Sequence, residues 1–291
     1  MTNNINTLNG SLSELGESMA NNLITMGVTD AQASDGLTTL ANRILDIPVT
    51  PVTPTLTLTT DKQILSSYDS DTLTLTATLT GGTVSGQTIE FFNGTTSMGT
   101  AQTNSSGVAT KIYSSTGVGD VTFSATKGSV ASQPITVEDC IYYTTSETEC
   151  TSSNNYITIA DLSSITLPSS FELSMDYKTN YEARCGLFNK STFTGNPNYS
   201  VFIGSPSTTG STWYYGYRTT STTTTDVSAS ATDYHTYTIT RNGNSFTYKR
   251  DTSGNYSKSI SWFNSYNYVI GMMTWGTGKY SYVKNIKLKA L

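Results

Sequence analysis

The chain has 291 residues, of which 36% are hydrophobic and 13% are charged, and its formal net charge is −5. This hydrophobic content is enough to build cores, so we expect a globular chain, and the acidic balance argues against a nucleic-acid partner because a phosphate backbone would meet no basic surface. The chain contains no window of about 18 apolar residues, and its first residues, MTNNINTLNG, lack the basic segment and apolar run of a signal peptide. We therefore expect neither a membrane span nor signal-directed export.

Residues 1–47 carry an apolar pattern that predicts a helical segment. Apolar side chains recur at spacings of three and four, with polar Asn22 on the same stripe, at Ile5, Leu8, Leu12, Leu15, Met19 and Met26. The spacing resumes at Leu37, Leu40, Ile44 and Ile47, and Pro48 ends it. A helix with so little to bury against favours a partner, so we expect an anchor that forms a homo-oligomer, with a trimer favoured, or docks onto another protein. A monomeric helical hairpin is the alternative.

Residues 48–55 read as a stiff linker, and the period changes to two from residue 56 onward. Prolines at three-residue intervals enforce extended backbone in the linker. The strand-like runs are 56–60, 71–80, 87–93, 107–115, 119–126 and 131–139, and turn residues separate them. In DTLTLTATLT (71–80), alternation directs the apolar residues to a core and the threonines outward. This pattern predicts an all-β sandwich over residues 56–139.

Three segments of this region carry a resemblance to a known domain type. They are DTLTLTATLT (71–80), NSSGVAT with Gly107 (104–110) and GDVTFSATKGS (119–129). The region resembles the bacterial immunoglobulin-like domains of invasin-type adhesins and phage tail proteins. The resemblance implies an immunoglobulin-like sandwich that acts as a spacer.

Residues 140–291 read as about ten short strands with polar loops, which favours a two-sheet jelly roll. The order of FELSMDYK (171–178), the hairpin HTYTITRNGNSFTYK (235–249), IGMM (270–273) and YSYVKNIKL (280–288) resembles the concanavalin A-like lectin/glucanase superfamily, especially its laminin-G-like members. The full fold prediction is a mainly β chain. An immunoglobulin-like β-sandwich is followed by a concanavalin A-like jelly-roll β-sandwich, with a short N-terminal α-helical segment.

His235 is the one histidine of the chain, and it opens the predicted hairpin. The dipeptide Asn242-Gly243 favours a two-residue turn, which would place Ile239 opposite Phe246. Alternation then directs apolar side chains to one face and threonines to the other. We expect His235 to be a structural residue at the end of a strand rather than a catalytic one.

The carboxylates of the C-terminal region also argue against catalysis. The resemblance implies that a retaining glucanase of this fold carries a Glu-x-Asp-x-(x)-Glu strand, and this chain has none. Glu172 and Asp176 share a strand face but lie about 13 Å apart along it. We therefore expect a protein that is not an enzyme, with glycoside hydrolysis as the least favoured alternative.

Aromatic and polar residues in three stretches predict a glycan-binding site. Sugars present C–H faces that stack on Trp and Tyr, and their hydroxyl groups pair with polar side chains. The stretches are STWYYGYRTT (211–220), SWFNSYNY (261–268) and TWGTGKY (274–280), whose two glycines indicate a loop. The predicted contacts are Trp275, which is favoured, and Lys279, Tyr280, Trp213, Tyr215, Tyr217, Arg218, Trp262 and Tyr266. The alternative for each aromatic residue is that it fills the sandwich.

The sequence gives little support for a cofactor or a metal. Cys140 and Cys150 would close a ten-residue loop if oxidised, and three free thiols, with Cys185, are the alternative. The resemblance to laminin-G-like domains implies calcium, but no DxDxDG-type loop is present, and Asp226, Asp233 and Asp251 are isolated candidates. We expect no cofactor.

These observations together predict a virion protein of the tail-fibre or receptor-binding type, from a tailed virus of bacteria or archaea. Its jelly roll would bind a glycan or protein of the host surface, and its N-terminal helices would bind other tail proteins. The alternatives are a virion decoration protein without a ligand and a cell-surface adhesin.

Overall fold

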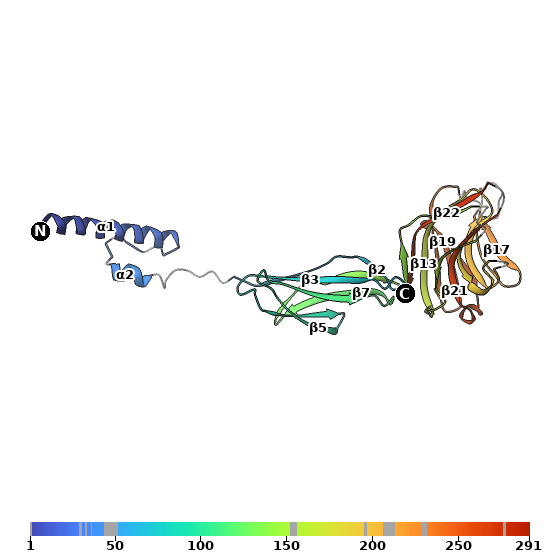
Figure 1. Cartoon of the computed structure of the whole chain (residues 1–291), viewed down its shortest axis with the longest axis horizontal. Helices are drawn as coiled ribbons and strands as arrows, with labels where there is room; N and C mark the ends of the chain where they lie inside the picture. Colours follow the sequence, from blue (N-terminus) through green and yellow to red (C-terminus); the bar gives the residue numbers. More distant parts are fainter. Residues whose placement is uncertain are drawn as a thin grey trace. The chain divides into compact units, whose positions relative to one another are not determined.

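The structure is a computed structural model that describes residues 2–28, 31, 32, 34, 35, 37–43, 52–151, 156–194, 197–205, 213–227, 232–275 and 278–291. Side chains are described in these ranges except at 2–8, 10, 37, 222–227 and 253–255. The chain forms two compact units, Met1–Thr53 and Pro54–Leu291. The fold is mainly β, as predicted, with a short N-terminal helical part (Figure 1).

The first unit contains helices α1 (Thr2–Thr25) and α2 (Leu37–Asn42). One small core joins them, made of Ala20, Leu23, Val28, Ala31 and Leu40, with Met19 packed against it. The chain thus folds back on itself as in the hairpin alternative, while Leu12 and Leu15 of the predicted stripe remain 43% and 49% exposed. Ile44, Ile47 and the side chains of Ile5, Leu8 and Leu37 lie outside the described residues. Neither described helix is both long enough and apolar enough to cross a membrane.

The second unit begins with the immunoglobulin-like sandwich, which has one sheet of order β1-β3-β6 and another of order β2-β9-β7-β4-β5, with β8 paired to β7. Leu73, Leu75, Ala77 and Leu79 are buried on β3, as the alternation predicted, because every second side chain faces the opposite sheet. Gly107 has φ +78°, and a Cβ there would lie 2.3 Å from the Leu79 carbonyl oxygen, so this turn requires glycine. The strands are β1 (Thr55–Thr60), β2 (Ile64–Ser66), β3 (Thr72–Thr80), β4 (Thr88–Asn93), β5 (Thr96–Gln102), β6 (Val108–Ser114), β7 (Gly119–Lys127), β8 (Val130–Ala131) and β9 (Ile135–Cys140).

The jelly-roll sandwich follows directly and consists of two sheets. Sheet I has the order β10-β22-β13-β18-β19-β20, with β11 also paired to β22, and sheet II has the order β12-β21-β14-β15-β16-β17. In sheet I the strands are β10 (Tyr142–Thr144), β11 (Thr148–Thr151), β13 (Ser170–Thr179), β18 (His235–Asn242), β19 (Ser245–Arg250), β20 (Ser253–Ser259) and β22 (Tyr280–Ala290). In sheet II they are β12 (Tyr156–Asp161), β14 (Ala183–Asn189), β15 (Ser200–Ser205), β16 (Trp213–Arg218), β17 (Thr222–Val227) and β21 (Tyr268–Thr274). Two single-turn 3₁₀ helices, Lys190–Thr192 and Phe263–Ser265, lie in the connections.

Sheet II is buried on both faces. Its inner face joins the main core against sheet I, and its outer face forms a second cluster with Phe188, Phe202, Tyr214, Val269 and Met273. Phe193, from the connection between β14 and β15, covers part of this outer face. Its ring lies over Gly271, where an added Cβ would come within 2.4 Å of the ring. The outer face therefore has an aromatic cover over its centre.

The predicted hairpin forms, but its register differs from the prediction by one residue in each strand. Asn242 pairs with Ser245, so the two-residue loop is Gly243-Asn244, and Ile239 lies opposite Tyr248 instead of Phe246. Neighbouring strand β13 explains the difference, because Asn242 also pairs with Ser170 and is thereby held in the strand. His235 lies at the strand end as expected, with Nδ1 2.8 Å from an Asp251 carboxylate oxygen.

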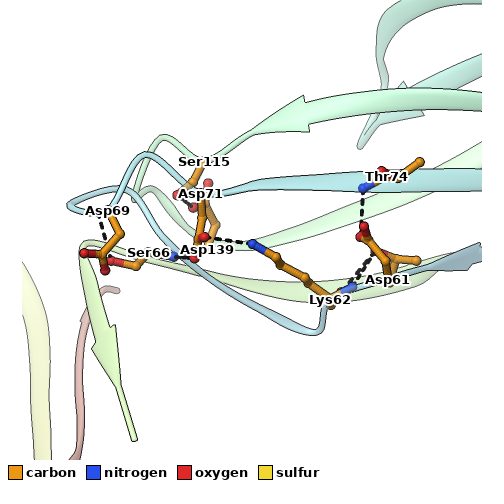
Figure 2. A network of polar contacts seen from close by, with 9 residues as sticks. Asp61, Lys62, Ser66, Asp69, Asp71, Thr74, Ser115 and Asp139 are labelled. Atoms are coloured by element: carbon orange, nitrogen blue, oxygen red, sulfur yellow. Dashed lines mark hydrogen bonds and ion pairs between the residues drawn. The ribbon is translucent and has the colours of Figure 1, made fainter. Parts of the chain in front are cut away.

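A polar network closes the immunoglobulin-like sandwich where its last strand, β9, ends (Figure 2). The buried carboxylate of Asp139 accepts hydrogen bonds from the backbone N–H groups of Thr116 at 3.0 Å and Gly117 at 3.1 Å, and from the hydroxyls of Tyr113 and Ser115. Burial raises the pKa of Asp139, but these hydrogen bonds outweigh it and lower the pKa below its ordinary value. The network anchors the turn after β6 to β9.

Two lysines of β22 connect the jelly roll with the immunoglobulin-like sandwich. Lys289 Nζ lies 2.6 Å from an Asp120 carboxylate oxygen, and Lys287 pairs with Glu138. Beside them, the Ile141 N–H donates to the Leu288 carbonyl oxygen at 2.8 Å. The two sandwiches thus share backbone and ionic contacts within one compact unit.

Candidate functional site

Strand β16 carries four of the predicted glycan contacts, and alternation separates them. Trp213 and Tyr215 face the main core and are only 2% and 4% exposed. Trp213 packs edge-on against Tyr237 with ring centroids 5.3 Å apart, so its indole is part of the sandwich interior. The prediction of these two residues as glycan contacts is therefore wrong, because they fill the core. Tyr217, also on the inner face, is half-buried.

The structure brings together two other predicted residues at one end of sheet II, which we call the Asn189 end. Here β14 ends, β15 begins, β16 ends and β21 begins. Tyr266 stacks on Tyr199 with ring centroids 4.2 Å apart, and Trp262 lies 5.4 Å from Tyr199. All three side chains are partly exposed. We call Tyr199, Trp262 and Tyr266 the aromatic cluster.

Tyr199 was not among the predicted site residues, but its backbone conformation in the structure is unusual. Tyr199 has φ +55°, a conformation that costs energy for a residue with a bulky side chain and that recurs at functional sites. The connection between β14 and β15 supplies Tyr199, and the connection before β21 supplies Trp262 and Tyr266. Hydrogen bonding to Tyr199 raises the pKa of Tyr266. The two tyrosines therefore interact through their hydroxyl groups as well as through their rings.

Two pockets flank Tyr266. One, of about 480 Å³, is lined by Asn189, Lys190, Ser191, Ser265, Tyr266 and Asn267. The other, of about 250 Å³, lies between the segment 163–167 and the segment 263–268, and we call it the Arg241 pocket. Lys190 lies 2.7 Å from Asp161 and lowers the pKa of that carboxyl to about 2 by hydrogen bonding. The surroundings of the aromatic cluster thus offer amide, hydroxyl and ammonium groups beside aromatic faces.

Arg218 lies near the same end, on the outer face of β16. Its Nε donates to the Asn198 side-chain oxygen at 3.1 Å. Burial, together with the charge of Arg184, lowers the pKa of Arg218. Arg184 and Arg218 therefore place two guanidinium groups on the outer side of sheet II, within electrostatic reach of each other.

The opposite end of sheet II, the Ala183 end, holds Trp275. Trp275 is half-buried and packs against the outer cluster, and the guanidinium of Arg184 lies 5.1 Å from its ring centroid. Arg184 Nε also donates to the Tyr214 hydroxyl at 2.7 Å. Tyr214 is 1% exposed and Arg184 is 9% exposed. A charged donor and a phenol thus form a nearly buried pair beside a half-exposed indole.

Lys279 and Tyr280 follow Trp275 but turn toward sheet I. Lys279 Nζ lies 4.9 Å from the Tyr181 ring centroid, and Tyr280, which is 37% exposed, lies 5.2 Å from the Tyr282 ring. Gly278 has φ +70°, as the predicted loop requires, and residue 276 lies outside the described residues. The predicted loop site therefore divides between Trp275 and the Lys279–Tyr280 pair.

The three cysteines are free and buried, as in the alternative of three free thiols, and the possible bond between Cys140 and Cys150 does not form. Strand pairing explains this, because Tyr142 lies opposite Leu288 whereas Cys150 lies opposite Ser281, far along the same strand. Burial raises the pKa of Cys140 to about 11, which makes its thiol unreactive.

The side chains of the types that bind metal are dispersed in the described part of the chain. Within the described ranges there is no group of three or more His, Cys, Asp and Glu side chains placed to hold a metal ion. Asp233 is exposed, Asp251 bonds to His235, and the side chain of Asp226 lies outside the described residues. Glu172 and Asp176 accept hydrogen bonds from Thr240 and Thr236 on the outer face of sheet I.

The chain was compared with protein-family models, curated proteins and solved structures. No protein-family model matches the chain, and no curated protein matches it. Similar solved structures include an alginate lyase at 12% identity, over 50% of this chain and 74% of the lyase, with a TM-score of 0.36. A β-glucanase of Bacillus licheniformis has 12% identity, over 59% of this chain and 79% of the enzyme, with a TM-score of 0.33. A lichenase from a mouse hindgut metagenome has 8% identity, over 84% and 96%, with a TM-score of 0.33.

These comparisons overturn two predictions from the sequence. The similar structures are polysaccharide-degrading enzymes, so the expectations of a non-enzymatic protein and of a virion receptor-binding protein with a lectin-like domain are wrong. No match points to a viral tail protein. Location in a virion, host partners and trimer formation remain predictions from sequence.

Proposed function

We propose that the C-terminal sandwich is a polysaccharide-active domain that takes a sugar chain at the Asn189 end of sheet II. The observation that carries this proposal is the aromatic cluster: Tyr199, Trp262 and Tyr266 are partly exposed, and Tyr266 lines two pockets that also hold polar groups. Aromatic rings bind the C–H faces of sugars, and a few placed polar groups fix their orientation. Lys190 and Asn267, which line the larger pocket, are the polar partners of this proposal.

The backbone of the cluster supports the same proposal. The left-handed conformation of Tyr199 is held by its stack on Tyr266 and by the neighbouring strand, in which Ser200 Oγ donates to the Pro197 carbonyl oxygen at 2.9 Å. A chain that needed only a core residue here would not require this strained backbone. The rigid stack would give a sugar ring a preformed face, which lowers the entropy lost on binding.

Cleavage of a sugar chain by β-elimination at the opposite, Ala183 end of sheet II is a second candidate function, and the Arg184–Tyr214 pair favours it. Tyrosine is among the side chains that act as general acids and bases, and a guanidinium at 2.7 Å stabilises its phenolate. In this reaction Tyr214 would remove the proton next to the carboxylate of a uronate residue. As the bond from the neighbouring ring carbon to the glycosidic oxygen breaks, Tyr214 would pass this proton to the leaving oxygen, and a double bond would form between the two ring carbons. Since Tyr214 is nearly buried, the sugar would approach beside Trp275.

The binding proposal is tested with a panel of acidic and neutral polysaccharides and calorimetry. Trp262→Ala and Tyr266→Ala should each weaken binding by about 1–3 kcal/mol, the range of a stacking residue. The matched control is Tyr143→Ala on β10, a partly exposed tyrosine of sheet I, which should leave affinity unchanged. Equal losses in all three variants, or no binding across the panel, would contradict the proposal.

The cleavage proposal is tested by the ultraviolet absorbance of the unsaturated product. Tyr214→Phe removes only the hydroxyl and keeps the ring that packs on Phe202 at 5.8 Å. We expect product formation to fall by at least about a hundredfold, as for loss of a general acid–base group, with binding retained. Product formation by the variant at the rate of the unaltered chain would show that Tyr214 is not the reacting group.

A further inference from the structure

Arg241 is a charged residue placed in a core. It lies on β18 between apolar neighbours of the main core and is 1% exposed. Its guanidinium carbon lies 4.8 Å from the ring centroid of Phe263 and 5.9 Å from those of Phe171 and Phe246. Such a position is costly for a charge that has no counter-ion, because removal from water disfavours the charged form.

All described hydrogen-bond partners of Arg241 are neutral. Nε donates to the Gly243 carbonyl oxygen at 2.8 Å, Nη1 to the Pro168 carbonyl oxygen at 3.1 Å, and Nη2 to the Asn264 side-chain oxygen at 2.6 Å. In the described part of the chain, no carboxylate forms an ion pair with it. Burial accordingly lowers the pKa of Arg241. The guanidinium keeps its positive charge even so, because arginine does not lose its proton in proteins.

A pocket opens beside this unneutralised charge. The Arg241 pocket has a volume of about 250 Å³, several times the share of one water molecule in the liquid, which is about 30 Å³. Apart from Arg241, its wall includes Ser163, Ser164, Thr166 and Asn267, which offer hydroxyl and amide groups. Tyr266 lines this pocket and also belongs to the aromatic cluster. A group bound here would lie next to a sugar that stacks on the cluster.

We propose that the Arg241 pocket binds the anionic group of an acidic sugar, a carboxylate or a sulfate ester, and so makes the domain selective for acidic polysaccharides. The proposal rests on the proposed function, because it places the acidic group on the chain that the aromatic cluster holds. Guanidinium binds such oxygen anions through charge-assisted hydrogen bonds. The bound anion would also supply the counter-charge that Arg241 lacks.

Arg241 also holds two connections together, since it bonds to Pro168 and Asn264, so substituting it would disturb the fold. The test therefore alters the rim. Ser164 is exposed and lines the pocket without any described bond to Arg241. Ser164→Glu places a carboxylate at the rim, where it repels an incoming anion or pairs with Arg241 itself. Ser164→Gln has nearly the same size without the charge and is the matched control.

Binding of an acidic and a neutral polysaccharide of matched length is measured by calorimetry on the full chain. Inorganic sulfate and glucuronate are measured alongside as small probes, with glucose as their neutral control. We expect the unaltered chain to prefer the acidic polymer. Ser164→Glu should weaken acidic binding by at least about tenfold, as unfavourable charge placement does, and should leave neutral binding unchanged. Ser164→Gln should stay close to the unaltered chain.

The outcomes separate the two proposals. Equal binding of acidic and neutral polymers, or equal loss in both Ser164 variants, would overturn the anion site and leave the polysaccharide function standing. Binding of sulfate and glucuronate that Ser164→Glu abolishes, without binding of any polymer, would support the anion site and overturn the polysaccharide function. Absence of both kinds of binding would overturn both.

Discussion

The Tyr113 hydroxyl donates a 2.6 Å hydrogen bond to the Asp139 carboxylate, across the end of the immunoglobulin-like sandwich. Because Asp139 is the penultimate residue of β9, this contact stabilises the sandwich just before β10, where the jelly roll starts. Desolvation and the hydrogen bond to Asp139 raise the pKa of Tyr113 to about 12, so its hydroxyl remains a donor at neutral pH. Substitution of Asp139 therefore tests directly how much this network contributes to the stability of the sandwich.

Replacing Asp139 with Ala should destabilise the second unit by about 3 kcal/mol or more. The substitution leaves the buried N–H group of Gly117 and the part-buried N–H group of Thr116 without this acceptor, and an unsatisfied buried group costs about 1–3 kcal/mol. Denaturant unfolding measures the change. The control is Asp69→Ala, an exposed aspartate drawn in the same network (Figure 2), which should change stability by less than about 0.5 kcal/mol. Equal effects at the two positions would refute the role given to Asp139.

Acid should remove the contribution of Asp139. Its pKa in the folded chain lies below the ordinary 3.8, so its stabilising effect is present above the unfolded-state pKa and is lost as the pH falls through the lower folded-state value. We expect the stability difference between the unaltered chain and Asp139→Asn to be constant from about pH 5 to 7 and to shrink below about pH 4. Denaturant unfolding at a series of pH values checks this. A difference that persists unchanged at the lowest pH would count against it.

Alternation in the sequence predicted individual strands well, but it did not predict what covers them. Leu73, Leu75, Ala77 and Leu79 are buried as expected, because one face of β3 meets one core. For sheet II, alternation predicted one buried face and one solvent-exposed face. In the structure Phe193 covers part of the outer face, and it comes from a connection far from β21 in sequence. The hairpin turn was misplaced because pairing of Asn242 with Ser170 outweighs the local turn preference.

The candidate site was only partly predictable for the same reason. Trp262 and Tyr266 were identified from their residue types, but Tyr199 comes from a connection some sixty positions earlier, and no local pattern links them. Arg241 could have been identified from the sequence, because alternation along the strand places this charged residue on the same face as the apolar core residues Tyr237 and Ile239. A charged residue on a predicted core face indicates either a paired charge or a binding site.

Leu12 and Leu15 of α1 are exposed in the single chain, so self-association through this helix stays a prediction. We expect the full chain to be oligomeric, with a trimer favoured, and the chain from residue 52 onward to be monomeric. Leu12→Lys combined with Leu15→Lys should dissociate the oligomer, because both leucines are exposed in the single chain and would be buried between copies. Glu14→Lys with Glu17→Lys is the control for charge. Light scattering that finds the unaltered chain monomeric at micromolar concentration would remove the proposal.

Substitution of Trp275 tests whether its indole serves packing alone or also contacts a sugar at the Ala183 end. Its ring packs against the outer cluster and lies 5.1 Å from the Arg184 guanidinium, yet it is only half-buried. Trp275→Ala should therefore cost about 1–3 kcal/mol of stability, less than the 3–5 kcal/mol of a fully buried tryptophan. If a sugar also stacks on the exposed part, polysaccharide affinity should fall by about 1–3 kcal/mol in the folded variant. Met273→Ala is the matched control, since Met273 lies in the same cluster but is fully buried, so it should lower stability and leave affinity unchanged. Thermal melting measures stability and calorimetry measures polysaccharide affinity for both variants. Unchanged affinity in folded Trp275→Ala would assign the indole to packing alone and exclude a sugar contact at this end of sheet II.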